Sequence, residues 1–347
     1  MSNKHFICLG IESSCDETAC AVVRDGKEVL ANLVSSQTDL HSIYGGVVPE
    51  IACRAHEEVI IPMIDRALEQ SGLALSDITA AAVTNTPGLI GALLVGISAA
   101  KAVSFVYNIP LIGINHIYSH LYAANLHFDA VEYPAIGFVI SGGHTSLFYS
   151  TSPTEHKLIG ATQDDAAGEA FDKAAKIMKL PYPGGPAIEK TALTGNPKAV
   201  RFPRSLLKNG SLDFSFSGIK TAVLYHCKGM NGALEGPDVY KESREDLAAS
   251  FQEAVVDTLA AKLEMAVRRY NPKGIIIGGG VAANKRLREK INLLGSRLAL
   301  KVYIPPIALC TDNAAVTAGL AYHYWRENKM ADMSLDAVPL NMDVSLG

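Results

Sequence analysis

The sequence predicts an α/β fold of two similar lobes that face each other across a ligand cleft. In the first half, strand-like runs at 80–84 and 111–114 flank a long apolar helix at 89–106, and this βαβ order favours a parallel strand pair. Both halves open with a β-hairpin whose turn is rich in small and polar residues, at 12–18 and at 141–145. The repeated hairpin indicates a duplicated domain.

The length of 347 residues suffices for two compact domains. We place the first lobe at 1–130 and the second at 131–312. A C-terminal helix at about 313–347 is expected to pack back on the first lobe. The segment at about 198–240 has many Gly, Pro, Ser and basic residues, and we expect it to be a loop-rich insertion in the second lobe.

The first lobe begins with strands and hairpin-type turns. Apolar runs predict strands at 6–11, 19–23 and 28–34. A helix is expected at 50–71, because apolar residues recur on one helical face and Gly72 provides a stop. The βαβ unit completes this lobe.

The second lobe has one long helix with strong support. Over 244–270 an apolar stripe recurs at helical spacing, and Asn271-Pro272 ends it. The other elements expected in this half are strands and helices bounded by Gly, Pro or polar residues: strands at 135–140, 146–150, 274–277 and 300–304, and helices at 284–294 and from about 312 to 328.

Composition describes an ordinary globular protein with reduced thiols. Hydrophobic residues make up 48% and charged residues 19%, and no two of the six cysteines have zinc-knuckle or redox spacing. The net charge of −4 excludes nucleic-acid binding by overall charge, so an RNA partner needs a local basic patch or a second subunit. The start of the chain does not resemble a secretion signal, and Lys101 interrupts the apolar stretch at 89–106. We therefore expect a cytoplasmic protein without a membrane span.

Two histidines four residues apart form the first candidate site. On a helix, His116 and His120 lie on one face and can hold one metal ion, with Asp312 at a helix start as the best third ligand. Iron(II) or zinc would suit this donor set. Ile117 occupies the position of the catalytic Glu of metallopeptidases, which disfavours hydrolysis. Structural histidines and an Asp that only caps its helix are the alternatives.

Three glycine-containing turns form the second candidate site. The turns at 10–18 and 141–145 offer backbone N–H groups and hydroxyls to a phosphate, although each can also be a plain β-turn. The segment 278–284 joins a buried strand to a helix, so its glycines and Asn284 can contact an adenosine.

Charged clusters offer less specific signals. Asp165, Glu169 and Asp172 recur at helical spacing and either bind a ligand or form a solvated face. Two groups of basic residues can bind RNA phosphates, and the second group can instead form a solvated helix face. These residues are Arg201, Arg204, Lys208 and Lys220, and the segment 285–290.

Nine segments, in this order, resemble the TsaD family of universal tRNA threonylcarbamoyltransferases, also called Gcp, and the bacterial type in particular. The resemblance spans essentially the whole chain. The segments are 10–18, 44–50, 116–120, 141–145, 164–173, 182–186, 213–220, 278–284 and 310–313.

The resemblance implies a two-domain actin/Hsp70-like (ASKHA) fold and an acyl transfer. The threonylcarbamoyl group would pass from threonylcarbamoyl-adenylate to N6 of the adenosine 3′ of the anticodon, in tRNAs that read codons starting with A. The same resemblance implies one Fe²⁺ or Zn²⁺ per subunit on His116, His120 and Asp312. It also implies a set of adenylate-binding residues: Val139, Ile140, Ser141, Gly142, Gly143, Asp172, Gly185 and Asn284.

Further residues and partners follow from the family pattern. Glu189 stands where some members have an Asp for the ribose. Apart from the resemblance, Asp16 and Glu17 are candidate general bases, because they lie in the first hairpin turn and face the predicted cleft. The expected partners are tRNA, a TsaB-like paralogue, a TsaE-like ATPase and a TsaC-like synthase that supplies the adenylate. A homodimer is an option where the paralogue is absent.

Two other functions compete with the transferase. One is a metallopeptidase of the O-sialoglycoprotein endopeptidase kind, which Ile117 disfavours. The other is a nucleotide-binding scaffold without catalytic activity.

Overall fold

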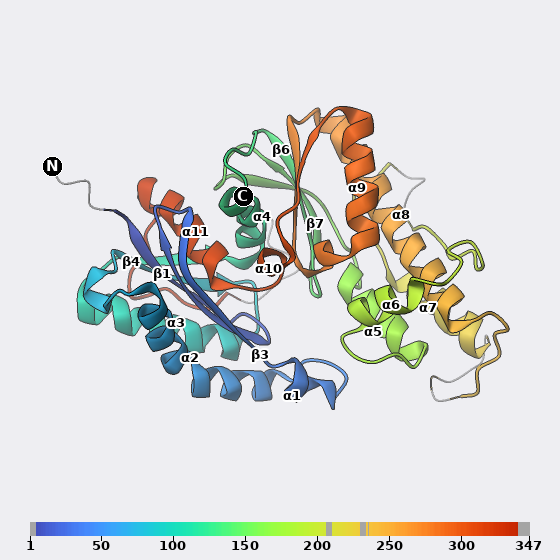
Figure 1. Ribbon diagram of the computed structural model, residues 1–347, viewed down its shortest axis with the longest axis horizontal. Coiled ribbons are helices and arrows are strands. Elements are labelled where there is room, and N and C mark those ends of the chain that lie inside the picture. The colour runs from blue at the N-terminus through green and yellow to red at the C-terminus, as the bar shows by residue number, and fades with distance from the viewer. Residues whose placement is uncertain (1–4, 206–209, 230–233, 235, 339–347) are drawn as a thin grey trace. The chain divides into compact units, whose positions relative to one another are not determined.

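The computed structural model describes residues 5–205, 210–229, 234 and 236–338. The chain divides into two compact units. The first unit comprises residues 1–130, 153–155 and 311–347, and the second comprises residues 131–152 and 156–310. Each unit has one five-stranded mixed sheet with helices packed on it (Figure 1).

The sheet of the first unit has the order β3-β2-β1-β4-β5. Strands β1, β2 and β3 are antiparallel neighbours, whereas β4 and β5 continue the sheet in parallel with β1. The parallel pair predicted from the βαβ order is therefore confirmed. The strands are β1 (Ile7–Glu12), β2 (Glu17–Arg24), β3 (Glu28–Ser36), β4 (Ala80–Thr86) and β5 (Leu111–Asn115).

Helices cover both faces of this sheet. Leu9 and Ile11 of β1 share a buried apolar cluster with residues of α2 and α3. Gly10 faces the other way, because side chains alternate along a strand, and it meets α11. The helices of this unit are α1 (Thr38–Ser42), α2 (Pro49–Ser71), α3 (Ile90–Tyr107), α4 (His116–His127) and α11 (Ala314–Arg326), with a 3₁₀ turn η1 (Leu75–Asp77).

The contact of α11 with β1 requires glycine at position 10. A Cβ at Gly10 would lie 2.6 Å from the carbonyl oxygen of Ala314 and 2.7 Å from the Cβ of Ala318. The backbone of β1 and the first turns of α11 are therefore in direct contact, and Figure 1 shows α11 in red against the blue strands. This contact fixes the start of α11 relative to the ends of the strands.

Helix α3 packs with only one face on the unit. Its buried residues, among them Leu93, Ile97 and Ala100, contact α2 and β4. Ile90, Leu94, Ser98, Phe105 and Val106 are exposed. By length and composition α3 passes the test for a membrane span, as the core helices of soluble proteins also do.

The second unit repeats the strand order of the first. Its sheet reads β8-β7-β6-β9-β10, with β6, β7 and β8 antiparallel and β9 and β10 parallel to β6. The duplication predicted from the two hairpins is thus visible in the topology. The strands are β6 (Ala135–Ile140), β7 (Thr145–Ser150), β8 (His156–Ala161), β9 (Gly274–Gly278) and β10 (Lys301–Tyr303).

The long helix α8 forms the centre of the second core. Its buried residues Leu247, Phe251 and Leu259 belong to one apolar cluster with residues of β6 and β9. Asn271 ends α8 in the left-handed conformation, as the Asn-Pro pair predicted. The helices of this unit are α5 (Ala167–Ile177), α6 (Gly184–Ala192), α7 (Ser217–Lys228), α8 (Arg244–Tyr270), α9 (Lys285–Leu298) and α10 (Ile307–Cys310), with a 3₁₀ turn η2 (Gly280–Ala283).

Several elements differ from the sequence-based expectation. Helix α7 lies inside the segment 198–240, which we expected to be loop-rich, and α6 (Gly184–Ala192) was not among the expected helices. The last helix ends at Arg326 rather than continuing through 313–347, of which residues 339–347 lie outside the described part.

The start of α7 depends on a residue far away in the sequence. The carboxylate of Asp164 accepts hydrogen bonds from the backbone N–H groups of Phe216 and Ser217 at 2.8 and 3.2 Å. It also accepts from the hydroxyls of Ser215 and Ser217, both at 2.6 Å. Asp164 thus caps the first turn of α7 from outside the helix, which local sequence patterns do not reveal.

We expect Asp164→Ala to loosen α7, because the first turn loses its external acceptor. The cost should be about 1 kcal/mol, the usual value of a helix cap. Hydrogen exchange of the α7 amides should become faster. Asp39→Ala, on the short helix α1 of the other unit, is the control and should leave α7 exchange unchanged. Unchanged exchange in Asp164→Ala would show that α7 is held by packing alone.

Candidate functional site

The two histidines of the predicted metal group lie in the first and second turns of α4. This helix follows β5 directly, and the side chain of Asn115 caps it by accepting from the backbone N–H groups of Ile117 and Tyr118 at 2.8 and 3.3 Å. His116 and His120 are buried, with 6% and 1% of their surface exposed. Their ring centroids lie 4.5 Å apart, so both imidazoles face one point.

Asp312 reaches the same point from the other end of the chain. It stands immediately before α11, whose first turn is capped by the side chain of Asn313. One carboxylate oxygen of Asp312 lies 3.7 Å from Nε2 of His116 and 3.3 Å from Nε2 of His120. All three groups belong to the first unit.

The spacing of these atoms fits a single transition-metal ion. Two donors bound at ~2.1 Å to one tetrahedral ion are ~3.4 Å apart, which matches both distances to Asp312. Neither nitrogen of the buried His120 ring has a hydrogen-bond partner among the described residues, because its contact with Asp312 lacks hydrogen-bond geometry. A metal ion would satisfy Nε2 and also bring the three donors together. The donor set of two imidazoles and one carboxylate leaves coordination positions open for a substrate oxygen.

Negative charge surrounds the histidine pair. Glu12, at the end of β1, is 1% exposed, and its Oε2 lies 3.2 Å from Nδ1 of His116. Burial alone would lower the pKa of His116, but the carboxylates of Asp312 and Glu12 outweigh it and raise the pKa to about 9. Burial would raise the pKa of Glu12, yet His116 holds it below its usual value. The centre therefore attracts positive charge, whether a proton or a metal ion.

The candidate general bases, Asp16 and Glu17, lie in the first hairpin of the chain, after β1. Asp16 lies in the turn and Glu17 begins β2. Burial, followed by the charges of Asp312 and Asp16, raises the pKa of Glu17 to about 9. At neutral pH Glu17 thus holds a proton.

The proton on folded Glu17 can be tested through the pH dependence of the stability of the metal-free protein. Unfolded Glu17 ionises near pH 4.5 but the folded residue only near pH 9, so the wild type loses stability as the pH rises between them. The glutamine of Glu17→Gln cannot ionise. The free energy of unfolding of this variant should therefore rise relative to that of the wild type, by at most about 1.4 kcal/mol per pH unit in this range.

Urea unfolding at about pH 5 and about pH 8 measures this difference. Glu58→Gln, an exposed glutamate on α2, serves as the control and should show no such trend. A constant difference between wild type and Glu17→Gln at both pH values would mean that Glu17 is ionised in the folded protein.

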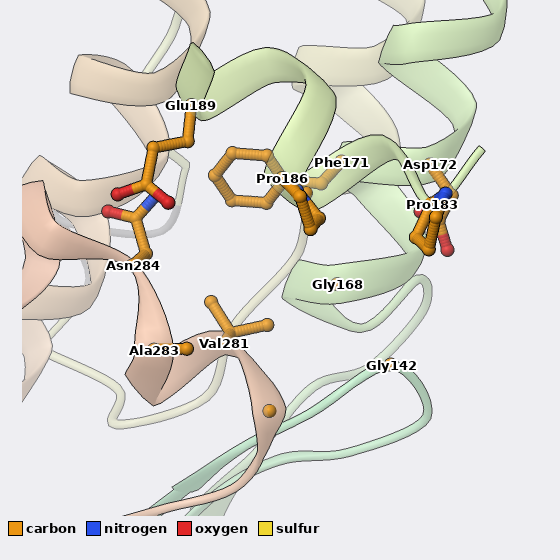
Figure 2. A pocket seen from close by; sticks show the side chains of 12 residues that line it. Gly142, Gly168, Phe171, Asp172, Pro183, Pro186, Glu189, Val281, Ala283 and Asn284 are labelled. Atoms are coloured by element: carbon orange, nitrogen blue, oxygen red, sulfur yellow. The ribbon is translucent and has the colours of Figure 1, made fainter. Parts of the chain in front are cut away.

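The second unit contains a pocket of about 210 Å³ at the carboxyl ends of its strands. Figure 2 shows the side chains of Glu189 and Asn284 pointing toward each other on one side and Asp172 on the other. The lining residues come from the β6–β7 turn, α5, α6 and η2: Gly142, Gly168, Phe171, Asp172, Pro183, Gly185, Pro186, Glu189, Gly280, Val281, Ala283 and Asn284.

Protein contacts orient the polar side chains of the pocket. Asp172 accepts from the backbone N–H of Gly184 at 2.7 Å, and Glu189 accepts from that of Lys285 at 2.6 Å. The amide of Asn284 donates to Oε1 of Gln252 at 2.8 Å, and its oxygen caps α9. Each group is therefore fixed before any ligand arrives. We did not identify Gln252 from the sequence, since only the structure places it beside Asn284.

Glycines open the pocket wall without being needed for packing. A Cβ built at Gly142, Gly185 or Gly280 would meet no atom within 4 Å, so it would project into open space. By contrast, a Cβ at Gly168 would lie 2.6 Å from the carbonyl oxygen of Ser141. Gly143, next in the β6–β7 turn, likewise has open space. The backbone is thus accessible to a ligand at these positions.

The remaining predicted adenylate residues stand around this turn. Val139 and Ile140 are fully buried in β6, and the hydroxyl of Ser141 accepts from the backbone N–H of His144 at 3.1 Å. None of these three lines the pocket itself. The structure thus brings Gly142, Asp172, Gly185, Glu189 and Asn284 together around one pocket and places the others beneath it or at its edge.

The charged clusters form ion pairs within the second unit. Asp165 pairs with Lys173 and Lys220 at 2.6 and 2.9 Å. Arg286 and Lys290 of α9 both pair with Glu253 of α8, and Arg204 pairs with Asp257. This pairing favours the structural reading of these basic residues over a role in RNA binding. Lys208 lies outside the described residues.

Two mixed sheets of the same strand order define an α/β protein of the actin/Hsp70-like class. Component A of the (R)-2-hydroxyglutaryl-CoA dehydratase of Acidaminococcus fermentans matches with a TM-score of 0.55 and 15% identity, over 93% of this chain and 99% of that chain. Full-length HypF in its phosphate- and nucleotide-bound form matches with a TM-score of 0.58 and 12% identity, over 92% of this chain and 46% of that chain. These likenesses concern the fold.

Sequence comparison identifies the family. The model of TsaD, tRNA N6-adenosine threonylcarbamoyltransferase, matches residues 28–319. Proteins of that name from Moorella thermoacetica and Protochlamydia amoebophila are 48% and 50% identical to this chain, in each case over 95% of it, and cover 95% and 96% of their own lengths. The chain therefore belongs to the TsaD family, and it is a transferase that acts on tRNA.

Proposed function

We propose that this protein transfers the threonylcarbamoyl group of threonylcarbamoyl-adenylate to N6 of the adenosine 3′ of the anticodon, in tRNAs that read codons starting with A. The reaction forms N6-threonylcarbamoyladenosine and releases AMP. The observation that carries this proposal is the open glycine wall of the pocket, in a chain whose relatives are tRNA N6-adenosine threonylcarbamoyltransferases. Such a wall suits the phosphate and ribose of an adenylate.

In this proposal the donor binds with its phosphate at the turn of Ser141, Gly142 and Gly143. The open backbone there lets N–H groups approach phosphate oxygens. Val139 and Ile140 hold this turn from within the sheet. Asp172, Gly185, Glu189 and Asn284, which surround the pocket, would bind the nucleoside.

His116, His120 and Asp312 would hold one Fe²⁺ or Zn²⁺ ion per subunit. When bound, the ion supplies a Lewis acid that can orient the donor and polarise its carbonyl group. The two imidazoles and the carboxylate already lie at the spacing that such an ion needs. The two imidazoles are buried, which limits the access of competing water.

The transfer itself needs little acid–base chemistry from the chain. N6 of the adenosine attacks the carbamoyl carbon, the bond from this carbon to the phosphate oxygen breaks, and AMP leaves with the electron pair. The attacking nitrogen then loses one proton. We propose Asp16 as the acceptor, because it lies in the first hairpin turn, whereas burial raises the pKa of its neighbour Glu17 to about 9 and leaves that carboxyl group protonated at neutral pH. Since the amine of adenine is a weak nucleophile, positioning contributes most of the rate.

We further propose that the protein acts in the cytoplasm, where its tRNA substrate is found, with a TsaB-like paralogue, a TsaE-like ATPase and a TsaC-like synthase. The exposed stripe of α3, with Leu94 and Phe105, supports docking of a paralogue or, in its absence, of a second copy. Such a stripe costs free energy in water and gains by being covered.

Reconstitution with threonine, bicarbonate, ATP, the partner proteins and tRNA tests this function, with nucleoside analysis as the readout. We expect modified adenosine with the wild type. His120→Ala and Asp312→Ala should each lower the bound metal and reduce transfer on the order of 10³-fold, because a lost Lewis acid costs several kcal/mol. His127→Ala, an exposed histidine at the end of α4, is the matched control.

Other outcomes would favour other functions. Full transfer by His120→Ala would remove the metal from the mechanism. Metal-dependent cleavage of a glycoprotein, without modification of tRNA, would support the metallopeptidase. Adenylate binding without either activity would leave a nucleotide-binding scaffold.

A glycine substitution tests the pocket separately. Gly185→Ala should leave the fold intact, because its Cβ meets no protein atom, but it should weaken AMP binding roughly tenfold, which is ~1.4 kcal/mol. Titration calorimetry with AMP measures this. Gly184→Ala is the contrasting variant, since its Cβ would lie 2.6 Å from Cα of Asp172 and should destabilise the unit. Equal AMP affinity of Gly185→Ala and wild type would place the nucleotide elsewhere.

A further inference from the structure

The buried carboxylate of Glu12 has no role in the proposed transfer. We propose that Glu12 is a positioning residue that fixes the tautomer and orientation of His116, so that Nε2 of this histidine is ready to bind the metal ion. This inference rests on the proposed metal site. Glu12 contacts a metal ligand without being one, and its role is tested by measuring metal affinity rather than threonylcarbamoyl transfer.

The topology of the sheet brings Glu12 to His116. Strands β1, β4 and β5 are parallel neighbours, so their carboxyl ends meet at one edge. Glu12 ends β1, Thr84 lies near the end of β4, and His116 follows β5 directly. Three segments that are far apart in the sequence therefore place their polar side chains together.

Every oxygen of Glu12 accepts a hydrogen bond. Oε1 accepts from the backbone N–H of Ser14 at 2.7 Å. Oε2 accepts from the hydroxyl of Thr84 at 2.6 Å and lies 3.2 Å from Nδ1 of His116. A carboxyl group surrounded by donors is an ionised acceptor, because a proton on either oxygen would face another donor.

The tautomer of His116 follows from this arrangement. Nδ1 must carry hydrogen in order to donate to Glu12, so when a metal ion displaces the other proton of the ring, the lone pair that binds the ion is that of Nε2. Nε2 is the nitrogen that faces Asp312, at 3.7 Å. The hydroxyl of Ser14, 3.2 Å from Nδ1, supports the same nitrogen from a second direction. A carboxylate behind a ligating histidine orients the ring and strengthens it as a donor.

The second histidine has no such support. Nδ1 of His120 is buried and has no hydrogen-bond partner among the described residues. The two ligands of α4 thus differ, because Nδ1 of His116 has polar partners behind the ring and Nδ1 of His120 has none among the described residues. We conclude that His116 is the preorganised ligand and that Glu12, together with Ser14, anchors its ring.

The isosteric variant Glu12→Gln tests this role. Its NH₂ group must replace an oxygen that now accepts from Ser14 or from Thr84 and His116, so a donor will face a donor. We expect the fold to persist and the affinity for Zn²⁺ or Co²⁺ to fall 10- to 100-fold, measured by competition with a chelator. The visible spectrum of the Co²⁺ protein should also change, which loss of stability alone would not produce. Glu12→Asp, which keeps the charge, should recover part of the affinity.

Asp164→Ala is the matched control, since it removes a carboxylate with four hydrogen bonds from the other unit. It should lower stability without changing metal affinity. Should Glu12→Gln fail to fold, Thr84→Val provides a milder change. It deletes one donor to Glu12 and should weaken metal binding by a smaller factor.

Histidine ¹⁵N NMR of the Zn²⁺-loaded wild type needs no variant. We expect His116 to show a protonated Nδ1 and a metal-bound Nε2. A metal-bound Nδ1, or unchanged metal affinity and Co²⁺ spectrum in Glu12→Gln, would overturn the role of Glu12. If His120→Ala also leaves the metal content unchanged, the metal site itself fails. If His120→Ala loses metal while Glu12→Gln does not, only the positioning role fails.

Discussion

The contact between Gly10 of β1 and the first turns of α11 is the constraint on which the metal centre depends. Because glycine has no side chain, the backbone of β1 touches α11 near Ala314. Asp312 directly precedes Asn313, the residue that caps α11. The packing of α11 on β1 therefore also brings the carboxylate of Asp312 to the histidines of α4. A larger side chain in β1 would push α11 away. The packing of α11 on β1 and the position of Asp312 beside the histidines thus both depend on the glycine at position 10.

The two units use one strand order for different chemistry. In the first, the carboxyl ends of the parallel strands carry polar side chains, namely the carboxylate of Glu12 and the hydroxyl of Thr84, and the start of the helix that bears the histidines. In the second, the equivalent edge carries glycines, whose exposed backbone forms the pocket wall. Duplication supplied the scaffold, and the residues at the strand ends specialised each copy. The first unit suits a cation, and for the second we propose an adenylate.

Local sequence patterns predicted the features that depend only on neighbouring residues in the sequence. The spacing of His116 and His120 and the apolar stripe of α8 could be read directly, because helical periodicity sets both. Asp312 could be named as a candidate from its place at a helix start, but its distance to the histidines depends on the packing of α11. Helix α7 could not be foreseen, since its cap, Asp164, comes from a segment about fifty residues earlier.

The same limit explains why Glu12 was not chosen from the sequence. In the motif 10–18 it stands beside several polar residues, and nothing local distinguishes it from Asp16 or Glu17. Their roles separate only through burial and partners. Glu12 is surrounded by donors and stays ionised, whereas burial, followed by the charges of Asp312 and Asp16, raises the pKa of Glu17 to about 9, so that Glu17 keeps its proton. Two carboxyl groups five residues apart thus carry opposite protonation states at neutral pH, and this difference arises from the fold and not from the residue type.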